Sequence, residues 1–260
     1  MQRERSMKKY NVLGIGNAVV DVISQSSDLF LEKMNIEKGI MQLVDRERGE
    51  LLYNSMDNRR HAPGGSVANT IAGIGELGLK TGFIGKVGND DLGNFYRSTM
   101  EEKGTDFLNE IIDESDLPTS RSMIFVSDDG ERSMNTYLGI SAELGPDDVN
   151  KEVASNAEIV FLEGYLFDKD KGKEAFIKVA KECRMAGGLS GIAISDPFCV
   201  ERHRSDFLSL IKNELDFVIG NKEEIMALFE TDNFESALLK AADISPLVVC
   251  TRSSEGVTAI

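Results

Sequence analysis

The stretch of residues 62–78 constrains the fold more than any other part of the chain. Its apolar residues recur at intervals of three and four and predict a helix over residues 67–77. They are Val67, Ile71, Ile74 and Leu77. The small residues Ala68, Ala72 and Gly75 form a second face that permits close packing. The stretch therefore predicts a helix packed closely beneath another element.

The turn sequence Gly64-Gly65-Ser66 precedes this helix, and we expect Ser66 to cap the helix and Gly78 to end it. Two glycines leave backbone N–H groups unobstructed beside the positive end of the helix dipole. This arrangement predicts a corner that receives a polar ligand, with the Asn69 amide pointing back toward it. The alternative is that Gly64 and Gly65 form only a tight turn.

Charge and cysteine content exclude several classes of protein. The 260 residues carry a formal net charge of −15, which disfavours nucleic acid and anionic membranes as partners. Three widely spaced cysteines with no C-x-x-C pair exclude a disulfide framework and a zinc site and favour the cytoplasm. No run of about 18 apolar residues could span a membrane. Residues 1–9 lack the apolar centre of a signal peptide and are expected to form a disordered leader.

Short apolar strands alternate with amphipathic helices from residue 146 onward. Strands are predicted over residues 159–162, 191–195, 216–219 and 247–250, and helices over residues 171–185, 200–213, 222–229 and 234–242. A first strand over residues 10–16, another over residues 81–85 and a helix over about residues 90–102 precede them. This alternation predicts an α/β fold with a parallel sheet covered on both faces.

Three early strands, over residues 39–44, 122–126 and 131–137, do not fit that layer. An Asp-Asp-Gly turn joins the last two, which are expected to form a hairpin. We place these strands in a small β-sheet lid drawn from about residues 17–45 and 120–138. Residues 10–260 are therefore expected to form one domain with an insertion.

Two common nucleotide-binding motifs are excluded. Gly14-x-Gly16 resembles the start of a dinucleotide fingerprint, but Val19 replaces the third glycine. The next acidic residue also follows Gly16 too soon to bind a ribose in that motif. No glycine-lysine-serine or glycine-lysine-threonine triplet of a P-loop occurs in the sequence.

Polar residues follow several strands at the point where each strand ends. They are Asn17, Asp21, Glu163, Asp196, Asn221 and Glu224. Because ligands of an open α/β sheet sit beyond the carboxyl ends of the strands, these residues are expected to converge on one edge. Asp196 and Asn221 also suit a plain loop or helix cap. Asp21 differs, because a carboxylate between apolar residues is costly to bury without donors, which a bound polyol would supply.

Three motifs together resemble the ribokinase-like (PfkB) carbohydrate and nucleoside kinases. They are Gly16-Asn17-x-x-x-Asp21, Gly64-Gly65-Ser66-x-x-Asn69 and Asn221-x-x-Glu224. The resemblance covers about residue 10 to the end and implies a three-layer sandwich with a central, mostly parallel sheet and a β-sheet lid. It implies that Asp21 and Asn69 bind sugar hydroxyls, that Asn17 also binds the substrate, and that the Gly64 and Gly65 backbone holds the ribose edge.

The same resemblance assigns the nucleotide side of the cleft. Asn221 and Glu224 would organise Mg²⁺ and its waters around the phosphates of ATP, and the strand leading to Thr251 would enter the ATP side. Phosphoryl transfer depends mainly on positioning and charge neutralisation, so this arrangement is physically coherent. The expected activity is an ATP-dependent kinase with an alcohol acceptor, and the expected cofactors are ATP and Mg²⁺.

Two departures from the family pattern concern the C-terminal end. Serine stands at Ser253, where the family usually has the glycine of threonine-x-glycine. The family's glycine-alanine-glycine-aspartate motif, which supplies an anion hole and the proton-accepting aspartate, does not occur. We therefore expect the natural protein to continue beyond Ile260 into a helix that carries this motif. The chain 1–260 is expected to bind ligand without transferring phosphate.

Residues 131–139 resemble the adenosine kinase branch more than ribokinase, so adenosine is the expected acceptor. In that branch the arginine matching Arg132 approaches the transferred phosphate, which makes Arg132 a candidate charge clamp. A solvated hairpin arginine is the alternative. Met134 and Tyr165 are candidates for a wall that contacts the purine, although such residues are more often part of a core.

Three other functions stay open. The chain could be a sugar kinase of the same family, resembling ribokinase or fructokinase, or a non-catalytic nucleoside or sugar sensor that uses the same pocket. It could also serve as a dimer scaffold through the exposed edge of its lid sheet. The expected oligomeric state is accordingly a monomer or a lid-mediated homodimer.

Overall fold

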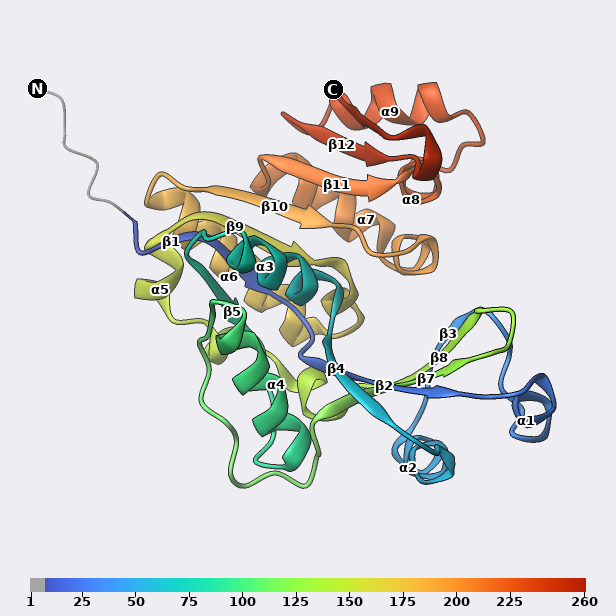
Figure 1. The fold of residues 1–260 in the computed structure, drawn as a ribbon. Helices are drawn as coiled ribbons and strands as arrows, with labels where there is room; N and C mark the ends of the chain where they lie inside the picture. Colours follow the sequence, from blue (N-terminus) through green and yellow to red (C-terminus); the bar gives the residue numbers. More distant parts are fainter. Residues whose placement is uncertain (1–7) are drawn as a thin grey trace, which may run out of the picture.

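Two β-sheets organise residues 8–260, the part of the chain that the computed structural model describes (Figure 1). The larger sheet has eight strands in the order β13-β12-β11-β10-β9-β1-β5-β6, and all neighbours run parallel except β12 and β13. Its strands are β1 (Tyr10–Ile15), β5 (Thr81–Ile84), β6 (Thr105–Phe107), β9 (Ala157–Glu163), β10 (Leu189–Ala193), β11 (Phe217–Asn221), β12 (Val248–Thr251) and β13 (Val257–Ala259). The mostly parallel central sheet predicted from the sequence is confirmed.

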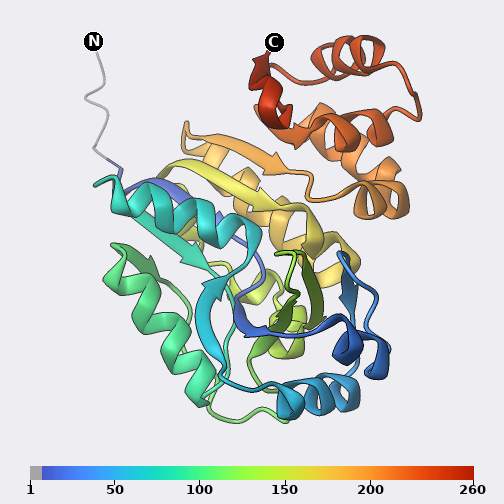
Figure 2. The same cartoon turned by 45° about the vertical axis from the view of Figure 1, so that its right-hand side comes forward.

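Helices pack on both faces of this sheet, which Figure 2 shows from a second direction. They are α3 (Ser66–Glu76), α4 (Asp91–Glu102), α5 (Lys151–Ser155), α6 (Asp170–Met185), α7 (Pro197–Glu214), α8 (Lys222–Leu228) and α9 (Phe234–Ala242), with short 3-10 segments η1 (Gly139–Glu143), η2 (Pro146–Asp148), η3 (Gly164–Asp168) and η4 (Ser253–Glu255). In β1, Leu13 and Ile15 join the apolar cluster that contains α6, whereas Val12 joins the cluster that contains α3. Since side chains alternate along a strand, one apolar strand supports two cores.

The second sheet forms the predicted lid and extends away from the main body (Figure 1). Its five strands have the order β3-β8-β7-β2-β4, and α1 (Asp28–Lys33) and α2 (Arg46–Ser55) accompany them. The strands are β2 (Val19–Gln25), β3 (Met41–Leu43), β4 (Arg60–Gly64), β7 (Ser120–Val126) and β8 (Arg132–Tyr137). Val22 and Phe125 pack with Leu31 of α1 and Leu52 of α2 on one face of the lid. Asp21 points to the opposite face, because side chains alternate along β2.

β4, α1 and α2 were not predicted from the sequence, and neither were β6 and α5 of the main body. β4 contains Pro63, which lacks a backbone donor, but it is an edge strand, where proline is tolerated. It extends the lid to residues 60–64, outside the ranges predicted for it. The side chains of Ser27 and Asp45 cap α1 and α2, so both helix starts carried a recognisable signal.

The predicted leader, residues 1–9, is described only in part. Residues 1–7 of the predicted leader lie outside the described residues. Lys8 is held against the core, because its ammonium group donates to the backbone carbonyls of Ser155 and Ala186. Within residues 8–260, no helix combines the length and apolar character needed to cross a membrane.

Candidate functional site

The carboxyl ends of the parallel strands meet at one edge of the main sheet. β1, β9, β10, β11 and β12 are successive neighbours there, and they bring to this edge Asn17, Glu163, Asp196, Asn221 and Thr251. The convergence predicted from the sequence is therefore present for Asn17, Glu163, Asp196, Asn221 and Glu224. Asp21, predicted at the same edge, lies instead within β2 of the lid. Adjacent strands lie about 4.8 Å apart, so the ends of β1 and β11, three strands apart, are separated by roughly 14 Å. The site is elongated, with one end beneath the lid and the other at β11 and β12.

Asp21 and Gly64 define the lid end of the site. They lie on the paired antiparallel strands β2 and β4, where Val19 is opposite Gly64 and Asp21 is opposite Ala62. A Cβ atom built on Gly64 would lie 2.3 Å from Asp21 Oδ1 and 2.9 Å from Asp21 Oδ2. The Asp21 carboxylate therefore occupies the space that any side chain at position 64 would need.

The Asp21 carboxylate is half-buried and chemically unsatisfied. No residue within 8–260 donates a hydrogen bond to it. Burial raises the pKa of Asp21 to about 6, and the positive charge of Arg132 opposes that rise. A group in this position gains most from donors supplied by a bound molecule. This is the property that the sequence analysis predicted for Asp21.

Arg132, Met134 and Asn69 come from elements that border this end of the site. Asp21 is in register with Ser122 of β7 and Thr136 of β8. Since alternate residues of a strand share a face, Arg132 and Met134 lie on the same face of the lid as Asp21. Asn69 is exposed in the first turn of α3, just beyond Gly65. These candidates are thus brought to one region.

The start of α3 differs from the prediction that Ser66 caps the helix. The N-cap residue is Gly65, with φ of 99°, and no side chain on the cap itself accepts a hydrogen bond. The backbone N–H and the hydroxyl of Ser66 both donate to Oε1 of Glu163, at 3.0 and 2.9 Å. Expecting Ser66 as the cap was wrong, because a carboxylate from β9 takes that place.

Glu163 also holds the end of β1. Its Oε2 atom accepts hydrogen bonds from the backbone N–H of Asn17 at 2.6 Å and from Asn17 Nδ2 at 3.0 Å. The glutamate is only 1% exposed, and burial raises its pKa while these donors oppose the rise. The anion at the N-terminus of α3 is thus a residue of the protein. Nδ2 of Asn17, a residue predicted to bind the substrate, is thus engaged within the protein.

Tyr165 and Asp196 lie between the two ends of the site. Asp196 caps α7 by accepting the backbone N–H of Cys199 at 2.8 Å. Burial, followed by the charge of Asp196, raises the pKa of Tyr165. Phe198, in the first turn of α7, is 72% exposed beside them. The sequence analysis missed Phe198, whose only signal was its position two residues beyond a strand-end aspartate.

Asn221 and Glu224 form the opposite end. Oδ1 of Asn221 accepts the backbone N–H of Glu224 at 2.8 Å, and Oε2 of Glu224 accepts the backbone N–H of Asn221 at 2.9 Å. This reciprocal capping box fixes both side chains at the start of α8. Burial is the main cause that raises the pKa of Glu224 to about 7, and the charge of Asp196 adds to it. Thr251 lies beside Asn221 in the parallel register of β11 and β12.

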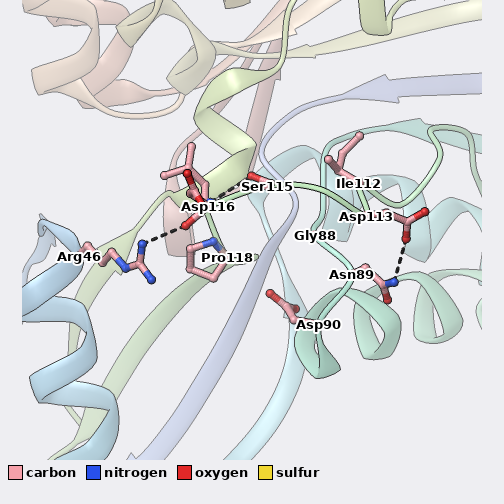
Figure 3. A pocket seen from close by; sticks show the side chains of 10 residues that line it. Arg46, Gly88, Asn89, Asp90, Ile112, Asp113, Ser115, Asp116 and Pro118 are labelled. Carbon is pink, nitrogen blue, oxygen red and sulfur yellow. Dashed lines mark hydrogen bonds between the residues drawn. The ribbon is translucent and has the colours of Figure 1, made fainter.

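A separate pocket of about 250 Å³ lies away from these residues (Figure 3). Its lining comes from the loop between β6 and β7, the start of α4, and Arg46 of α2. Arg46 donates to the backbone carbonyl of Asp116, and Asn89 donates to the carboxylate of Asp113. None of the candidate residues named above lines it. The pocket is therefore distinct from the sheet-edge site.

Comparison with known proteins agrees with this arrangement. The sequence matches the family described as pfkB family carbohydrate kinase over residues 38–260. A probable sugar kinase from Rhizobium etli superposes with a TM-score of 0.91 at 41% identity, covering 98% of this chain and 77% of that one. Adenosine kinase from Sinorhizobium meliloti superposes with a TM-score of 0.90 at 42% identity, covering 97% and 77%.

The curated relatives are more distant. 5-Dehydro-2-deoxygluconokinase from Halalkalibacterium halodurans is 29% identical over 171 residues, which cover 64% of this chain and 51% of that protein. The chain thus spans about half the length of the curated relatives that it matches first. The family match extends over most of the chain, and the whole fold is shared with solved kinases at more than 40% identity. The chain belongs to the pfkB family of carbohydrate kinases.

Proposed function

We propose that the protein transfers phosphate from ATP to the primary hydroxyl of a ribose-containing acceptor, with adenosine as the best candidate. The observation that carries the proposal is the half-buried Asp21 carboxylate, which has no recorded hydrogen bond within residues 8–260. Two vicinal hydroxyls would satisfy its two oxygens at once. Such charge-assisted hydrogen bonds are the strong ones in a partly dehydrated site.

Arg132 has the position required of a charge clamp in this proposal. It is exposed at the start of β8, on the lid face that carries Asp21. Its positive charge acts to lower the pKa of that carboxylate. The guanidinium group presents donors that suit phosphate oxygens. An arginine carried by the lid would approach the transferred phosphoryl group as the lid closes over the acceptor. The reaction needs that charge most at the transition state.

The nucleotide end suits a magnesium ion held mainly by phosphates. Within residues 8–260, no group of three His, Cys, Asp or Glu side chains gathers at any point. Mg²⁺ in kinases commonly keeps several waters and uses one or two carboxylates. Glu224 is the candidate carboxylate, and the negative charge of Asp196, which helps to raise the pKa of Glu224, would add to the attraction for a cation. Bound Mg²⁺ would neutralise phosphate charge during transfer.

Adenosine is favoured over a free sugar by the aromatic side chains beside the site. Phe198 and Tyr165 lie between the acceptor end and the phosphate end, and Phe198 leaves most of its surface free. A purine can stack on an exposed ring, whereas a small sugar gains little from one. The 42% identity to an adenosine kinase supports the same choice, while the similarity to a sugar kinase at 41% identity supports the alternative acceptor.

No residue of the described part is assigned as the proton acceptor. Both oxygens of Glu163 are taken by donors from Asn17 and Ser66. Asp196 uses Oδ1 to cap α7. The proposal therefore gives residues 8–260 the roles of acceptor binding, phosphate neutralisation and metal positioning.

Calorimetric titration of the 260-residue protein with adenosine, ribose and fructose tests the proposed acceptor. Adenosine should bind at least about tenfold more tightly than either sugar, since stacking adds about 1–3 kcal/mol per base. Phe198→Ala should remove that preference, and Phe234→Ala in α9 is the matched control. Transfer of labelled γ-phosphate is then measured with the complete natural gene product. Tighter binding of ribose or fructose would favour a sugar kinase, and binding without transfer would favour a sensor.

A cytoplasmic location and the oligomeric state belong to the proposal as well. All three cysteines are unpaired and buried, which suits a reducing compartment. Leu43 and Met41 of β3 are exposed at the edge of the lid sheet, which is the surface a lid-mediated homodimer would use. Sedimentation of the wild type and of Leu43→Lys would distinguish a dimer from a monomer.

A further inference from the structure

The buried carboxylate of Glu163 joins three segments that are far apart in the sequence. Its two oxygens accept hydrogen bonds from Asn17 and Ser66, which lie 146 and 97 residues away. The backbone nitrogen of Val67 makes an additional, longer contact with Oε1, at 3.5 Å. Every short contact of this carboxylate is therefore with a donor of the protein itself.

These segments are the places where the chain passes between the main sheet and the lid. Residues 16–18 connect β1 of the main sheet to β2 of the lid, and Gly65 connects β4 of the lid to α3 on the main sheet. Figure 1 shows both connections side by side at the base of the lid. Glu163, at the end of β9, holds both of them from the main sheet.

The two connections are also packed against each other without spare room. A Cβ atom on Gly65 would lie 2.5 Å from the backbone oxygen of Asn17, and a Cβ atom on Gly16 would lie 3.0 Å from Glu163 Oε2. The position of each connection therefore depends on the other and on the carboxylate. Asp21 lies on β2, four residues beyond Asn17, and Gly64 directly precedes Gly65.

We propose that Glu163 is a positioning residue: its buried carboxylate fixes both lid connections so that Asp21 and Gly64 face the acceptor. It does so without touching the acceptor, because its oxygens are already occupied by donors from Asn17 and Ser66. The amides at the start of α3 are a favourable place for this negative charge. The inference rests on the proposed function for its effect on binding, but its effect on the connections stands independently.

Glu163→Gln is the direct test, because a carboxamide has one acceptor oxygen and cannot serve both sets of donors. Hydrogen exchange of the unliganded protein should accelerate at least about tenfold at Asn17, Ser66 and Val67, with β11 and β12 unchanged. The dissociation constant for adenosine should rise about 100-fold, as for a displaced positioning group, while binding of Mg²⁺ with ATP stays within twofold. Glu158→Gln is the matched control, since that exposed glutamate lies on the same strand.

Ser66→Ala supplies a milder second variant in case Glu163→Gln folds poorly. It removes one donor to Glu163 and keeps the backbone amide, so a smaller rise in the adenosine dissociation constant is expected. If Ser66 acts through Glu163, its effect should vanish in the Glu163→Gln background. Additive effects would mean that Ser66 or Glu163 contacts the acceptor directly and would overturn the proposal.

The exchange measurement separates this inference from the proposed function. If the wild type does not bind adenosine but Glu163→Gln still accelerates exchange only at the two connections, the proposed acceptor fails and the positioning role stands. Unchanged exchange at Asn17 and Ser66 would overturn the positioning role whatever the acceptor. Acceleration throughout the main sheet would show a general structural role and would overturn it as well.

Discussion

The Asp21 carboxylate lies across the bare Cα atom of Gly64, so closely that a Cβ atom there would approach Oδ1 to 2.3 Å. The two residues come from antiparallel neighbours in the lid, and neither position can be understood alone. The glycine makes room for the acid, and the acid faces the open end of the site. The burial of Asp21 and its raised pKa therefore depend on the absence of a side chain at position 64.

Gly64→Ala should displace the Asp21 carboxylate without unfolding the main sheet. The dissociation constant for adenosine is expected to rise about 100-fold, because a shift of about 1 Å at a positioning group can cost that much. Calorimetry measures the affinity, and circular dichroism checks the fold. Gly73→Ala in α3 is the control, since a Cβ there meets nothing within 4 Å and should be neutral or slightly stabilising. Wild-type affinity in Gly64→Ala would refute the steric argument.

Asp21→Asn should stabilise the unliganded protein while it weakens adenosine binding. The pKa of Asp21 is raised to about 6 from 3.8, so the ionised form is disfavoured by folding at neutral pH. The wild type is accordingly expected to lose stability as pH rises from about 4 to about 6, and the asparagine variant should lack that loss. Its gain at pH 7 should be about 2 kcal/mol after allowance for partial exposure.

Denaturation in urea at pH 4 and pH 7 measures this difference, with adenosine affinity followed in parallel. An affinity about 100-fold lower is expected, because charge-assisted hydrogen bonds are worth about 1.5–3 kcal/mol each. A variant that is less stable than the wild type at pH 7 would show that Asp21 has protein partners instead of an open, ligand-facing position.

Arg132→Gln should raise the pKa of Asp21 further, because the arginine is the charge that opposes the rise. Adenosine binding requires the ionised carboxylate, so the pH at which affinity is half-maximal should move upward from about 6. Affinity measured between pH 5 and pH 8 gives that midpoint. Arg60→Gln is the matched control, since Arg60 lies opposite Ile23 on the same lid face. An equal shift in both variants would mean a general effect of lid charge.

The parts of the fold that depend on local pattern could be predicted from the sequence. The strand–helix alternation after residue 146, the β7–β8 hairpin, and Val67 and Ile71 of α3 have their expected form. Leu77, predicted for the same apolar face of α3, is instead the C-cap residue and is 84% exposed. β4 could not be predicted, because its strand character comes from pairing with β2 and its sequence contains Pro63 and Gly64. Pairing partners distant in sequence leave no periodic signal in a strand of five residues.

The role of Glu163 marks the limit of prediction within the site. Its position at the end of a strand could be read from the sequence, but its burial could not. Its donors lie in two other segments, however, and only the assembled fold brings Asn17 and Ser66 to it. Asp21 was identified by the same physical reasoning because its apolar neighbours are adjacent in sequence. A buried carboxylate can therefore be recognised from the sequence when the residues around it are its sequence neighbours, and not when they come from distant segments.

Glu224→Gln should impair the use of Mg²⁺ and ATP while adenosine binding persists, because Glu224 follows β11, whose end lies roughly 14 Å from that of β1 by strand spacing, and Asp21 lies in the lid beyond β1. Burial, helped by Asp196, raises the pKa of Glu224 to about 7 from 4.5. The unliganded wild type should therefore lose stability as pH rises from about 4.5 through about 7. A bound cation favours the ionised form, so Mg²⁺–nucleotide affinity should fall as pH drops below 7. In the glutamine variant both pH dependences should be weaker, and kcat of the complete enzyme should fall about 10- to 100-fold with a higher Mg²⁺ requirement.

Glu223→Gln, a change at the neighbouring glutamate outside the capping pair, is the control. Titration with Mg²⁺ and ATP between pH 6 and pH 8, beside adenosine calorimetry, measures these effects. If adenosine affinity falls and the Mg²⁺ requirement is unaltered, the acceptor and nucleotide ends have been assigned the wrong way round.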